Sequence, residues 1–250
     1  MYKSLELTVG NKLLRGCVRL PEGNGPFPVV CFYHGFSVDK VGLLRLHEAF
    51  ARLLTASGFG CVRFDFYGCG ESDGNFDEMR VSDEIEQGKA IYEWASVQSF
   101  AAPGRIYPVG HSLGGVIASI VAANYQPKGA ILWSPGLTVY YDISNRVSAV
   151  PDHYQENYDM EGLQISGEFF KDVRSLDLLK LAEGYKNKVL VVHGDRDEKV
   201  PVAVVGQYRD LYGNAMKLVI VDGANHQFSS VPWRQKVLDI SIEFLKTVDR

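Results

Sequence analysis

The stretch that most constrains this chain is Gly110-His111-Ser112-Leu113-Gly114, where a short apolar run stops and an Ala/Ile/Val-rich helical pattern begins. A Gly-x-Ser-x-Gly pattern between a strand and a helix forms a turn so tight that only small residues fit two positions before and after the serine. Such a turn exposes the serine hydroxyl above the edge of a sheet, and the N-terminus of the following helix favours negative charge there. Ordinary strand-to-helix turns can also contain this pattern, so its meaning depends on partner residues elsewhere in the chain.

The composition is typical of a globular chain that binds neither nucleic acid nor a membrane. Apolar residues make up 46% of the sequence, charged residues 22%, and the formal net charge is −4. Charges interrupt the first seven residues, and no window approaches eighteen uninterrupted apolar residues, so we expect a cytoplasmic protein. Four cysteines without Cys-x-x-Cys spacing predict neither a disulfide framework nor a metal site, and we expect no cofactor. The sequence does not define the oligomeric state.

Strand-like apolar runs alternate with helical patterns along most of the chain. This alternation predicts a mostly parallel central sheet with helices on both faces, formed by one α/β domain over residues 1–250. Ser82, followed by two acidic residues, is a plausible N-cap for one of the helices. We expect a peripheral hairpin over 5–20, strands at 29–33, 60–66, 105–109, 129–133, 188–193 and 216–221, and helices over 43–58, 82–95 and 233–248, besides the helix after Ser112.

The segment from about 135 to 180 breaks this alternation. It contains no clean strand pattern, and six aromatic residues are interleaved with acidic and polar ones. A structureless loop of this length is improbable inside a compact domain, so we predict an inserted cap with some elements of its own. Phe169 and Phe170 are candidates for stacking on a planar ligand, although packing of the cap onto the core explains such aromatics equally well.

A serine hydroxyl is a poor nucleophile at neutral pH unless a histidine accepts its proton and a carboxylate orients that histidine. In chains with a Gly-x-Ser-x-Gly turn, the order is serine, acid, histidine. Three histidines follow Ser112: His153 falls in the predicted cap, His193 lies within an apolar strand, and His226 lies in a polar loop directly after a strand. Strand ends are where such sheets place their chemistry, so we predict His226 as the base.

The acid is expected on the loop that follows the preceding strand. That loop, Gly194-Asp195-Arg196-Asp197-Glu198, offers three carboxylates. Asp197 lies in the middle of the loop, where it can turn back toward His226, and we predict it as the acid. Asp195 remains the alternative, because the conformation of the loop decides which carboxylate reaches the imidazole.

Two backbone N–H groups are needed to stabilise the negative charge on a tetrahedral intermediate. One comes from the residue after the nucleophile and the other from the loop after an earlier strand. These residues are Leu113 and Phe36, the latter in His34-Gly35-Phe36, where glycine lets the backbone approach the reacting carbon. The Gly68-Cys69-Gly70 turn does not extend to a dinucleotide motif, because Asp73 stands where that motif requires its third glycine.

Several stretches together resemble the α/β-hydrolase superfamily, and within it the bacterial cinnamoyl (feruloyl) esterases. The resemblance implies the α/β-hydrolase fold and a serine esterase that forms an acyl-enzyme, and it supports Asp197, three positions after Gly194 and four before Pro201. It also implies that the cap forms the acyl pocket for a hydroxycinnamoyl group. Those esterases usually carry histidine or a similar polar residue where Cys69 stands, which leaves the substrate open. The stretches are His34-Gly35-Phe36, residues 64–74, 110–115 and 193–201, and Gly223-Ala224-Asn225-His226.

The same residues are compatible with other functions. A monoacylglycerol lipase-like enzyme or short-chain carboxylesterase would use the same three side chains, as would a hydrolase of amides or carbon–carbon bonds. A non-catalytic binding module of the same fold is the alternative from a different class. Because such a module does not need a nucleophile, base, acid and two oxyanion donors together, the sequence favours an enzyme that acts on a small-molecule ester.

Overall fold

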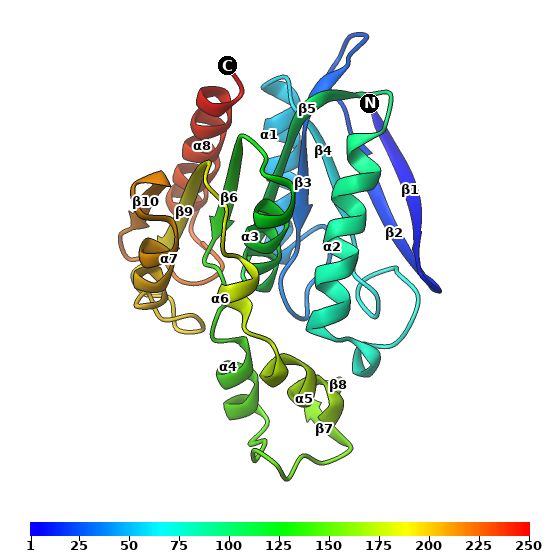
Figure 1. The fold of residues 1–250 in the computed structure, drawn as a ribbon, viewed down its shortest axis with the longest axis vertical. Coiled ribbons are helices and arrows are strands. Elements are labelled where there is room, and N and C mark those ends of the chain that lie inside the picture. Colours follow the sequence, from blue (N-terminus) through cyan, green and yellow to red (C-terminus); the bar gives the residue numbers. More distant parts are fainter.

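The structure, a computed structural model, describes residues 1–250 and is built around one eight-stranded sheet (Figure 1). The strand order is β1-β2-β4-β3-β5-β6-β9-β10; β1 and β2 pair antiparallel, as do β2 and β4, and all other neighbours are parallel. This arrangement confirms the predicted α/β-hydrolase fold.

The strands of the main sheet match the predicted apolar runs closely. They are β1 (Tyr2–Val9), β2 (Lys12–Arg19), β3 (Phe27–Tyr33), β4 (Gly60–Phe64), β5 (Ala101–His111), β6 (Gly129–Trp133), β9 (Lys188–Gly194) and β10 (Met216–Val221). The helices that connect or flank them are η1 (Leu43–Arg45), α1 (Leu46–Ala56), η2 (Phe76–Glu78), α2 (Val81–Ser96), α3 (Leu113–Tyr125), α7 (Val204–Tyr212), η3 (Gly213–Ala215) and α8 (Val231–Val248).

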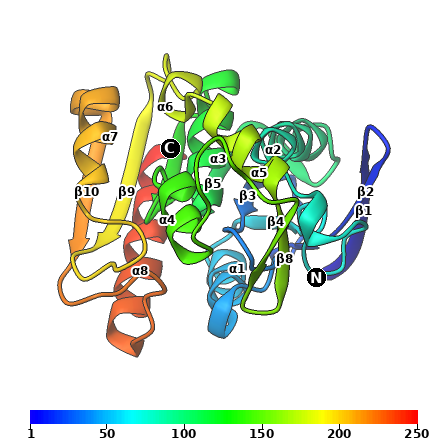
Figure 2. The ribbon, with the colours of Figure 1, turned by 90° about the horizontal axis from the view of Figure 1, so that it is seen from below.

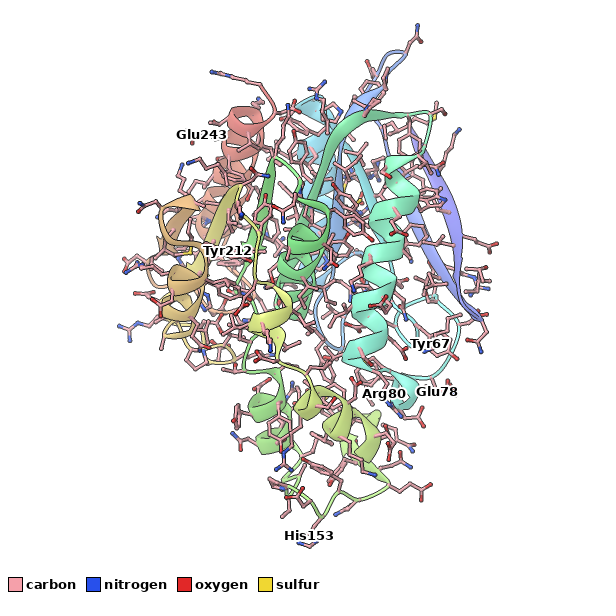
Figure 3. The ribbon with its side chains drawn as sticks, viewed as in Figure 1. Tyr67, Glu78, Arg80, His153, Tyr212 and Glu243 are labelled. Atoms are coloured by element: carbon pink, nitrogen blue, oxygen red, sulfur yellow. The ribbon has the colours of Figure 1, made fainter.

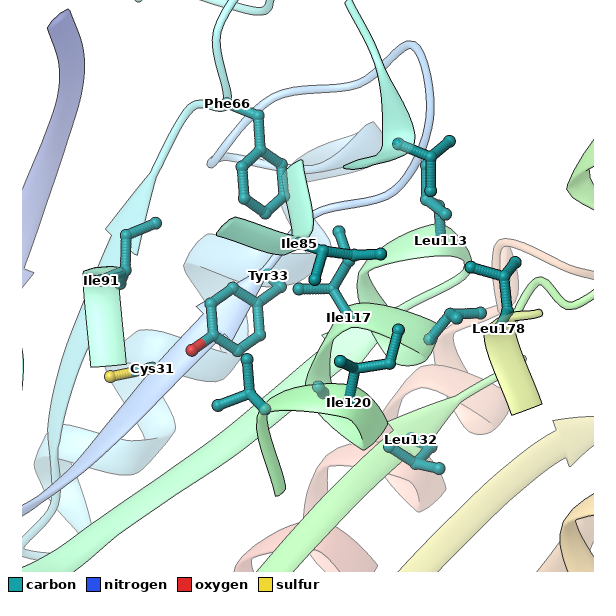
Figure 4. Packing of buried hydrophobic residues seen from close by; sticks show 14 of the residues in the cluster. Cys31, Tyr33, Phe66, Ile85, Ile91, Leu113, Ile117, Ile120, Leu132 and Leu178 are labelled. Atoms are coloured by element: carbon teal, nitrogen blue, oxygen red, sulfur yellow. The ribbon is translucent and has the colours of Figure 1, made fainter. Parts of the chain in front are cut away.

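Alternate residues of each strand point to opposite faces of the sheet, and each face is buried by its own helices. In β3, Cys31 and Tyr33 join a core with α2, α3 and α7, whereas Val30 and Phe32 join a second core with α1 and α8. Figure 2 shows α1 and α8 on one side of the sheet and α2, α3 and α7 on the opposite side. Figure 4 shows how residues of α2 and α3, such as Ile85 and Ile117, pack around Tyr33. No helix is long and apolar enough to span a membrane.

Most of the chain between β6 and β9 lies beyond the carboxyl ends of the parallel strands, below the sheet in Figure 1. It consists of α4 (Val139–Arg146), the antiparallel hairpin of β7 (Asn157–Met160) and β8 (Leu163–Ser166), α5 (Gly167–Ser175) and α6 (Leu178–Leu181). Its buried residues join the core on the α2 and α3 side of the sheet. We refer to residues 135–180 as the inserted segment; its function as a cap stays a prediction.

Two helix starts differ from the predictions. Leu44 and Arg45 have φ angles of 51° and 61°, so the backbone is left-handed there and α1 begins only at Leu46. The second helix, α2, begins at Val81, and its N-cap is Arg80 rather than Ser82. Ser82 lies inside the helix, where its N–H and its hydroxyl both donate to the carboxylate of Asp172 in α5. A side chain remote in sequence thus replaces the local cap that we expected.

Candidate active site

Ser112 lies at the turn between β5 and α3 in a strained conformation, with φ of 57° and ψ of −124°. The turn is tight because the backbone segments before and after it touch. A Cβ atom on Gly110 would lie 1.9 Å from the carbonyl oxygen of Gly114, and a Cβ on Gly114 would lie 2.2 Å from that of Tyr33. Side chains at these positions would therefore break the turn, which explains the spacing of the motif.

The Phe36 and Leu113 N–H groups have no acceptor within the protein. Leu113 is the first residue of α3, where a backbone N–H has no partner in its own helix. Phe36 lines the same cavity as Ser112. A Cβ on Gly35 would lie 3.5 Å from Ser112 Oγ, and a Cβ on Gly136 would lie 3.1 Å from the Leu113 nitrogen, so the two glycines leave space around the serine. Two free donors and a hydroxyl thus border one small space.

His226 and Asp197 meet at the carboxyl ends of β10 and β9. Nδ1 of His226 lies 2.8 Å from Oδ2 of Asp197, and both residues are buried. Oδ1 of the same carboxylate accepts the N–H groups of Lys199 and Val200. Asp195, the alternative acid, instead accepts the N–H of Gly223 at 2.7 Å and is exposed. The loop therefore brings Asp197 to the imidazole and uses Asp195 to join two loops.

A second histidine supports this carboxylate. Nε2 of His193 lies 3.3 Å from Oδ2 of Asp197 and 2.9 Å from the carbonyl oxygen of Val200. Burial alone would raise the pKa of Asp197, but the hydrogen bonds with His193 and His226 outweigh it and hold the pKa well below its usual range. Asp197 is consequently ionised at all ordinary pH values, as a group that stabilises an imidazolium must be.

His111, inside the serine motif, holds the loop that carries His226. Its Nε2 lies 2.9 Å from the carbonyl oxygen of His226, and the two rings stack with centroids 5.1 Å apart. Because a carbonyl oxygen can only accept, this nitrogen carries the proton. Burial, followed by the nearby His226, lowers the pKa of His111 to about 3, so the ring is neutral. Nothing in the sequence singles out His111, because the motif allows any amino acid at its position.

Ser112 and His226 line one cavity, with an empty volume of about 580 Å³. The Ser112 hydroxyl makes no hydrogen bond within the protein; in enzymes without a bound substrate, catalytic hydrogen bonds are often long or poorly aligned. His47 lines this cavity too, and burial holds its pKa well below the usual range, so it is neutral. Lys199, on the loop of Asp197, also lines the cavity. Neither His47 nor Lys199 was predicted from the sequence as a site residue.

One face of α4 forms the wall contributed by the inserted segment. Val139, Asp142, Ile143 and Arg146 recur at helical spacing and all line the cavity. The Asp142 carboxylate has no hydrogen-bond partner, and partial burial raises its pKa. Their helical spacing is the one feature of the sequence that could have predicted that these four residues share a helix face.

The structure corrects the prediction for Phe169 and Phe170, which do not line the cavity. Both are fully buried in α5. The Phe169 ring packs on Phe36 at 5.3 Å, and the Phe170 ring stacks on Tyr154 at 5.4 Å. Phe169 thus joins the inserted segment to the chain after β3, whereas Phe170 packs on a residue of the segment itself. His153 lies exposed at the far tip of the segment, remote from the sheet (Figure 3).

The site presents a hydroxyl, a buried imidazole–carboxylate pair and two free N–H groups. No group of three or more His, Cys, Asp or Glu side chains is arranged to hold a metal ion, and all four cysteines are buried as free thiols. The sheet topology, with Ser112 at the turn after β5, defines the α/β-hydrolase fold.

Within that class, the chain belongs to the family described as X-Pro dipeptidyl-peptidase (S15 family), whose model matches residues 11–155. A second model, described as an uncharacterised protein family (UPF0227), matches residues 86–241.

Curated relatives share moderate identity with parts of the chain. An uncharacterised 31.7 kDa protein of Escherichia coli is 36% identical over 108 residues, which are 43% of this chain and 37% of the relative. Lysophosphatidylserine lipase ABHD12 of Danio rerio is 25% identical and is matched over 84% of this chain and 54% of its own length. The chain thus spans about a third to a half of the length of the first curated relatives that it matches.

Solved structures share the whole fold. Est1E from Butyrivibrio proteoclasticus, solved with ferulic acid bound, superposes with a TM-score of 0.88 over 97% of this chain and 98% of its own, at 24% identity. Mouse α/β-hydrolase domain-containing protein 10 superposes with a TM-score of 0.75 over 98% of this chain and 99% of its own, at 20% identity. At these identities the likeness establishes the fold.

Proposed function

We propose that this protein is a carboxylic ester hydrolase that forms an acyl-enzyme on Ser112. The observation that carries the proposal is the 2.8 Å contact between His226 Nδ1 and Asp197 Oδ2 on the cavity that Ser112 lines. With Asp197 bound at Nδ1, the neutral imidazole has its lone pair on Nε2, the state required of a general base.

In the proposed reaction, the Ser112 hydroxyl turns about its Cα–Cβ bond toward Nε2 of His226 and loses its proton as it attacks the ester carbonyl. The negative charge that forms on the carbonyl oxygen is stabilised by the N–H groups of Phe36 and Leu113. His226 then protonates the departing alcohol, and the acyl group remains on Ser112. In the second half, His226 takes a proton from water as the water oxygen attacks the acyl carbon. The bond between the acyl carbon and Ser112 Oγ then breaks, His226 returns the proton to Oγ, and the acid is released.

We further propose hydroxycinnamoyl esters as the substrate class. Support comes from the sequence resemblance and from the full-length fold likeness to Est1E, whose structure holds ferulic acid. The apolar side chains Val139 and Ile143 of α4 would flank a planar acyl chain in the cavity. Phe169 and Phe170 are left out of this proposal, because they are buried away from the cavity.

The nucleophile is tested by labelling with a serine-directed fluorophosphonate and by hydrolysis of 4-nitrophenyl butyrate. Ser112→Ala should abolish labelling and lower kcat by about 10⁶-fold while the protein stays folded. Asp197→Asn should lower kcat by about 10⁴-fold. Asp195→Asn is the matched control and should leave kcat within about threefold of the wild type, because the Asp195 side chain accepts a hydrogen bond from Gly223 and none from His226. A wild-type protein that is neither labelled nor active would identify a binding module instead.

The substrate class is tested with methyl ferulate, 4-nitrophenyl butyrate and a monoacylglycerol, compared by kcat/KM. The proposal expects the highest value for methyl ferulate. Equal or higher values for either of the other esters would contradict the hydroxycinnamoyl assignment while leaving the esterase assignment intact.

A further inference from the structure

The segment that carries the Phe36 N–H, residues 34–40, has no regular secondary structure of its own. It leaves the end of β3, and Ser37 within it has a left-handed φ of 56°. The Phe36 N–H forms no hydrogen bond in the protein. The Phe36 ring packs on Phe76 and Phe169, and the backbone that directs this N–H is held by hydrogen bonds at the two ends of the segment.

The first end is held by His34, which is fully buried. Its Nε2 accepts the N–H of Phe66 at 2.9 Å, and its Nδ1 lies 2.8 Å from the carbonyl oxygen of Gly35. Since the carbonyl can only accept, Nδ1 carries the proton and the ring is neutral; burial, which lowers the pKa of His34, favours the same state. His34 thus joins the start of the segment to the chain just after β4.

The second end is held by Lys40, which is 8% exposed. Its backbone N–H and its ammonium group each donate to the Asp65 carboxylate at 2.6 Å. The ammonium group also donates to Glu71 at 2.6 Å, and the carbonyl oxygen of Lys40 accepts from Arg63 at 2.9 Å. The backbone and the side chain of one residue are therefore fixed by three partners, all between residues 63 and 71.

Asp65 is itself enclosed by the Gly68-Cys69-Gly70 turn. The carboxylate is fully buried and accepts the N–H of Glu71 at 2.9 Å. Gly70 has a φ of +53°, and a Cβ atom there would lie 2.3 Å from Asp65 Oδ2. The glycine-rich turn, which the sequence excludes as a dinucleotide motif, thus has a physical reason: it lets the backbone wrap around the carboxylate that binds Lys40.

We propose that Lys40, bound to Asp65, is a positioning residue that aims the Phe36 N–H at the oxyanion. This inference rests on the proposed ester hydrolysis and names the part of the fold that prepares its oxyanion site. A buried ion pair is a weak source of net stability, but it fixes geometry, because breaking it leaves an uncompensated charge. Charge development in the transition state depends on donors whose direction is set before the reaction begins.

The test compares Lys40→Met with the wild type in the hydrolysis of 4-nitrophenyl butyrate, and kcat and KM are measured separately. Loss of one oxyanion donor lowers kcat by about 10²-fold to 10³-fold, so we expect a fall of roughly 100-fold in kcat with KM within about twofold. Affinity for an alkylboronic acid, which forms a tetrahedral adduct on the serine, should fall by the same factor as kcat/KM. Lys89→Met, which removes the ion pair between the half-buried Lys89 and the exposed Glu86 of α2, is the matched control and should change none of these.

A loss of folding in Lys40→Met is separated from a loss of positioning by the double variant Lys40→Met/Asp65→Asn. Removing both charges leaves no unpaired buried charge, so the unfolding temperature should recover while kcat stays low. The proposal is overturned if Lys40→Met keeps wild-type kcat, if its loss lies in KM alone, or if kcat recovers together with stability in the double variant. Wild-type protein that lacks both esterase activity and fluorophosphonate labelling would instead overturn the proposed function.

Discussion

At the scale of single residues, Gly136 controls the space in which the proposed oxyanion would form. A Cβ atom there would lie 3.1 Å from the Leu113 nitrogen and 3.4 Å from Ser112 Oγ. Gly136→Ala should therefore lower kcat for 4-nitrophenyl butyrate by roughly 10-fold to 100-fold. This fall is at most as large as the smallest effect of removing one oxyanion donor, about 100-fold. The backbone at Gly136 does not have a positive φ, so any fall in unfolding temperature should come only from the close contacts of the added Cβ with Leu113 N and Ser112 C.

The control for this substitution is Gly206→Ala in α7, where an added Cβ meets no atom within 4 Å. It should leave kcat unchanged and stabilise the helix slightly, since alanine has the higher helix propensity. If Gly136→Ala hydrolyses the ester as fast as Gly206→Ala, the space beside Leu113 does not receive the oxyanion.

The sequence could predict which residue types form the site, but not every contact. Ser112 and His226 follow from the strand-end positions of their motifs, and Asp197 follows from its place in the middle of its loop and from the family resemblance. The loop conformation, which the sequence leaves open, then brings Asp197 rather than Asp195 to the imidazole. Phe169 and Phe170 were misplaced because a sequence shows that aromatic residues gather in a segment, not which side of it faces a cavity.

At the scale of elements, α2 is capped by a residue of the inserted segment. The Asp172 carboxylate in α5 accepts both the N–H and the hydroxyl of Ser82 in the first turn of α2. Removing an N-cap side chain costs about 1 kcal/mol, so Asp172→Ala should lower the free energy of unfolding by about that amount. In urea unfolding, Ser82→Ala should add little to Asp172→Ala, because the two side chains act together.

Asp177→Ala is the matched control. Asp177 caps α6 by accepting the N–H of Lys180, within the inserted segment itself. Its effect should add fully to that of Ser82→Ala. If the losses in free energy of unfolding from Asp172→Ala and Ser82→Ala add fully, the contact between these two side chains does not stabilise the fold.

The strands and most helices were predictable because each buries alternate or helically spaced apolar residues. The start of α1 could not be predicted in this way. Leu43 and Leu44 continue the apolar spacing of the helix, but they lie exposed at a left-handed turn. The β7–β8 hairpin was also not predicted strand by strand. Its four-residue strands are too short for a clear pattern, and the hairpin is packed against η2 of the core.

At the scale of the whole molecule, contacts between distant parts of the chain determine what neither motifs nor periodicity show. Lys40 follows β3 and Asp65 follows β4, and these strands are neighbours in the sheet. In the sequence, each of them looks like an ordinary charged residue in a loop. Only the order of the strands, which places the two loops side by side, makes them a buried pair.

Such burial also predicts how the stability of the whole fold depends on pH. Glu84 in α2 is 1% exposed, and neither of its carboxylate oxygens has a hydrogen-bond partner. Burial, with smaller contributions from the charges of Asp83 and Asp172, raises its pKa well above the ordinary value. The folded state therefore keeps this proton at pH values where the unfolded chain, with a pKa of about 4.3, has released it.

Because the folded state binds the proton more tightly, the stability contributed by Glu84 is complete below about pH 4.3 and declines as pH rises toward the folded-state pKa. The decline is about 1.4 kcal/mol per pH unit at most, or roughly 3–6 °C in unfolding temperature for a chain of this size. Glu84→Gln stays neutral, so its advantage over the wild type in unfolding temperature should grow from pH 5 to pH 8. Glu86→Gln, an exposed change on the same helix, should run parallel to the wild type. Parallel curves for Glu84→Gln as well would mean that Glu84 is ionised in the folded protein.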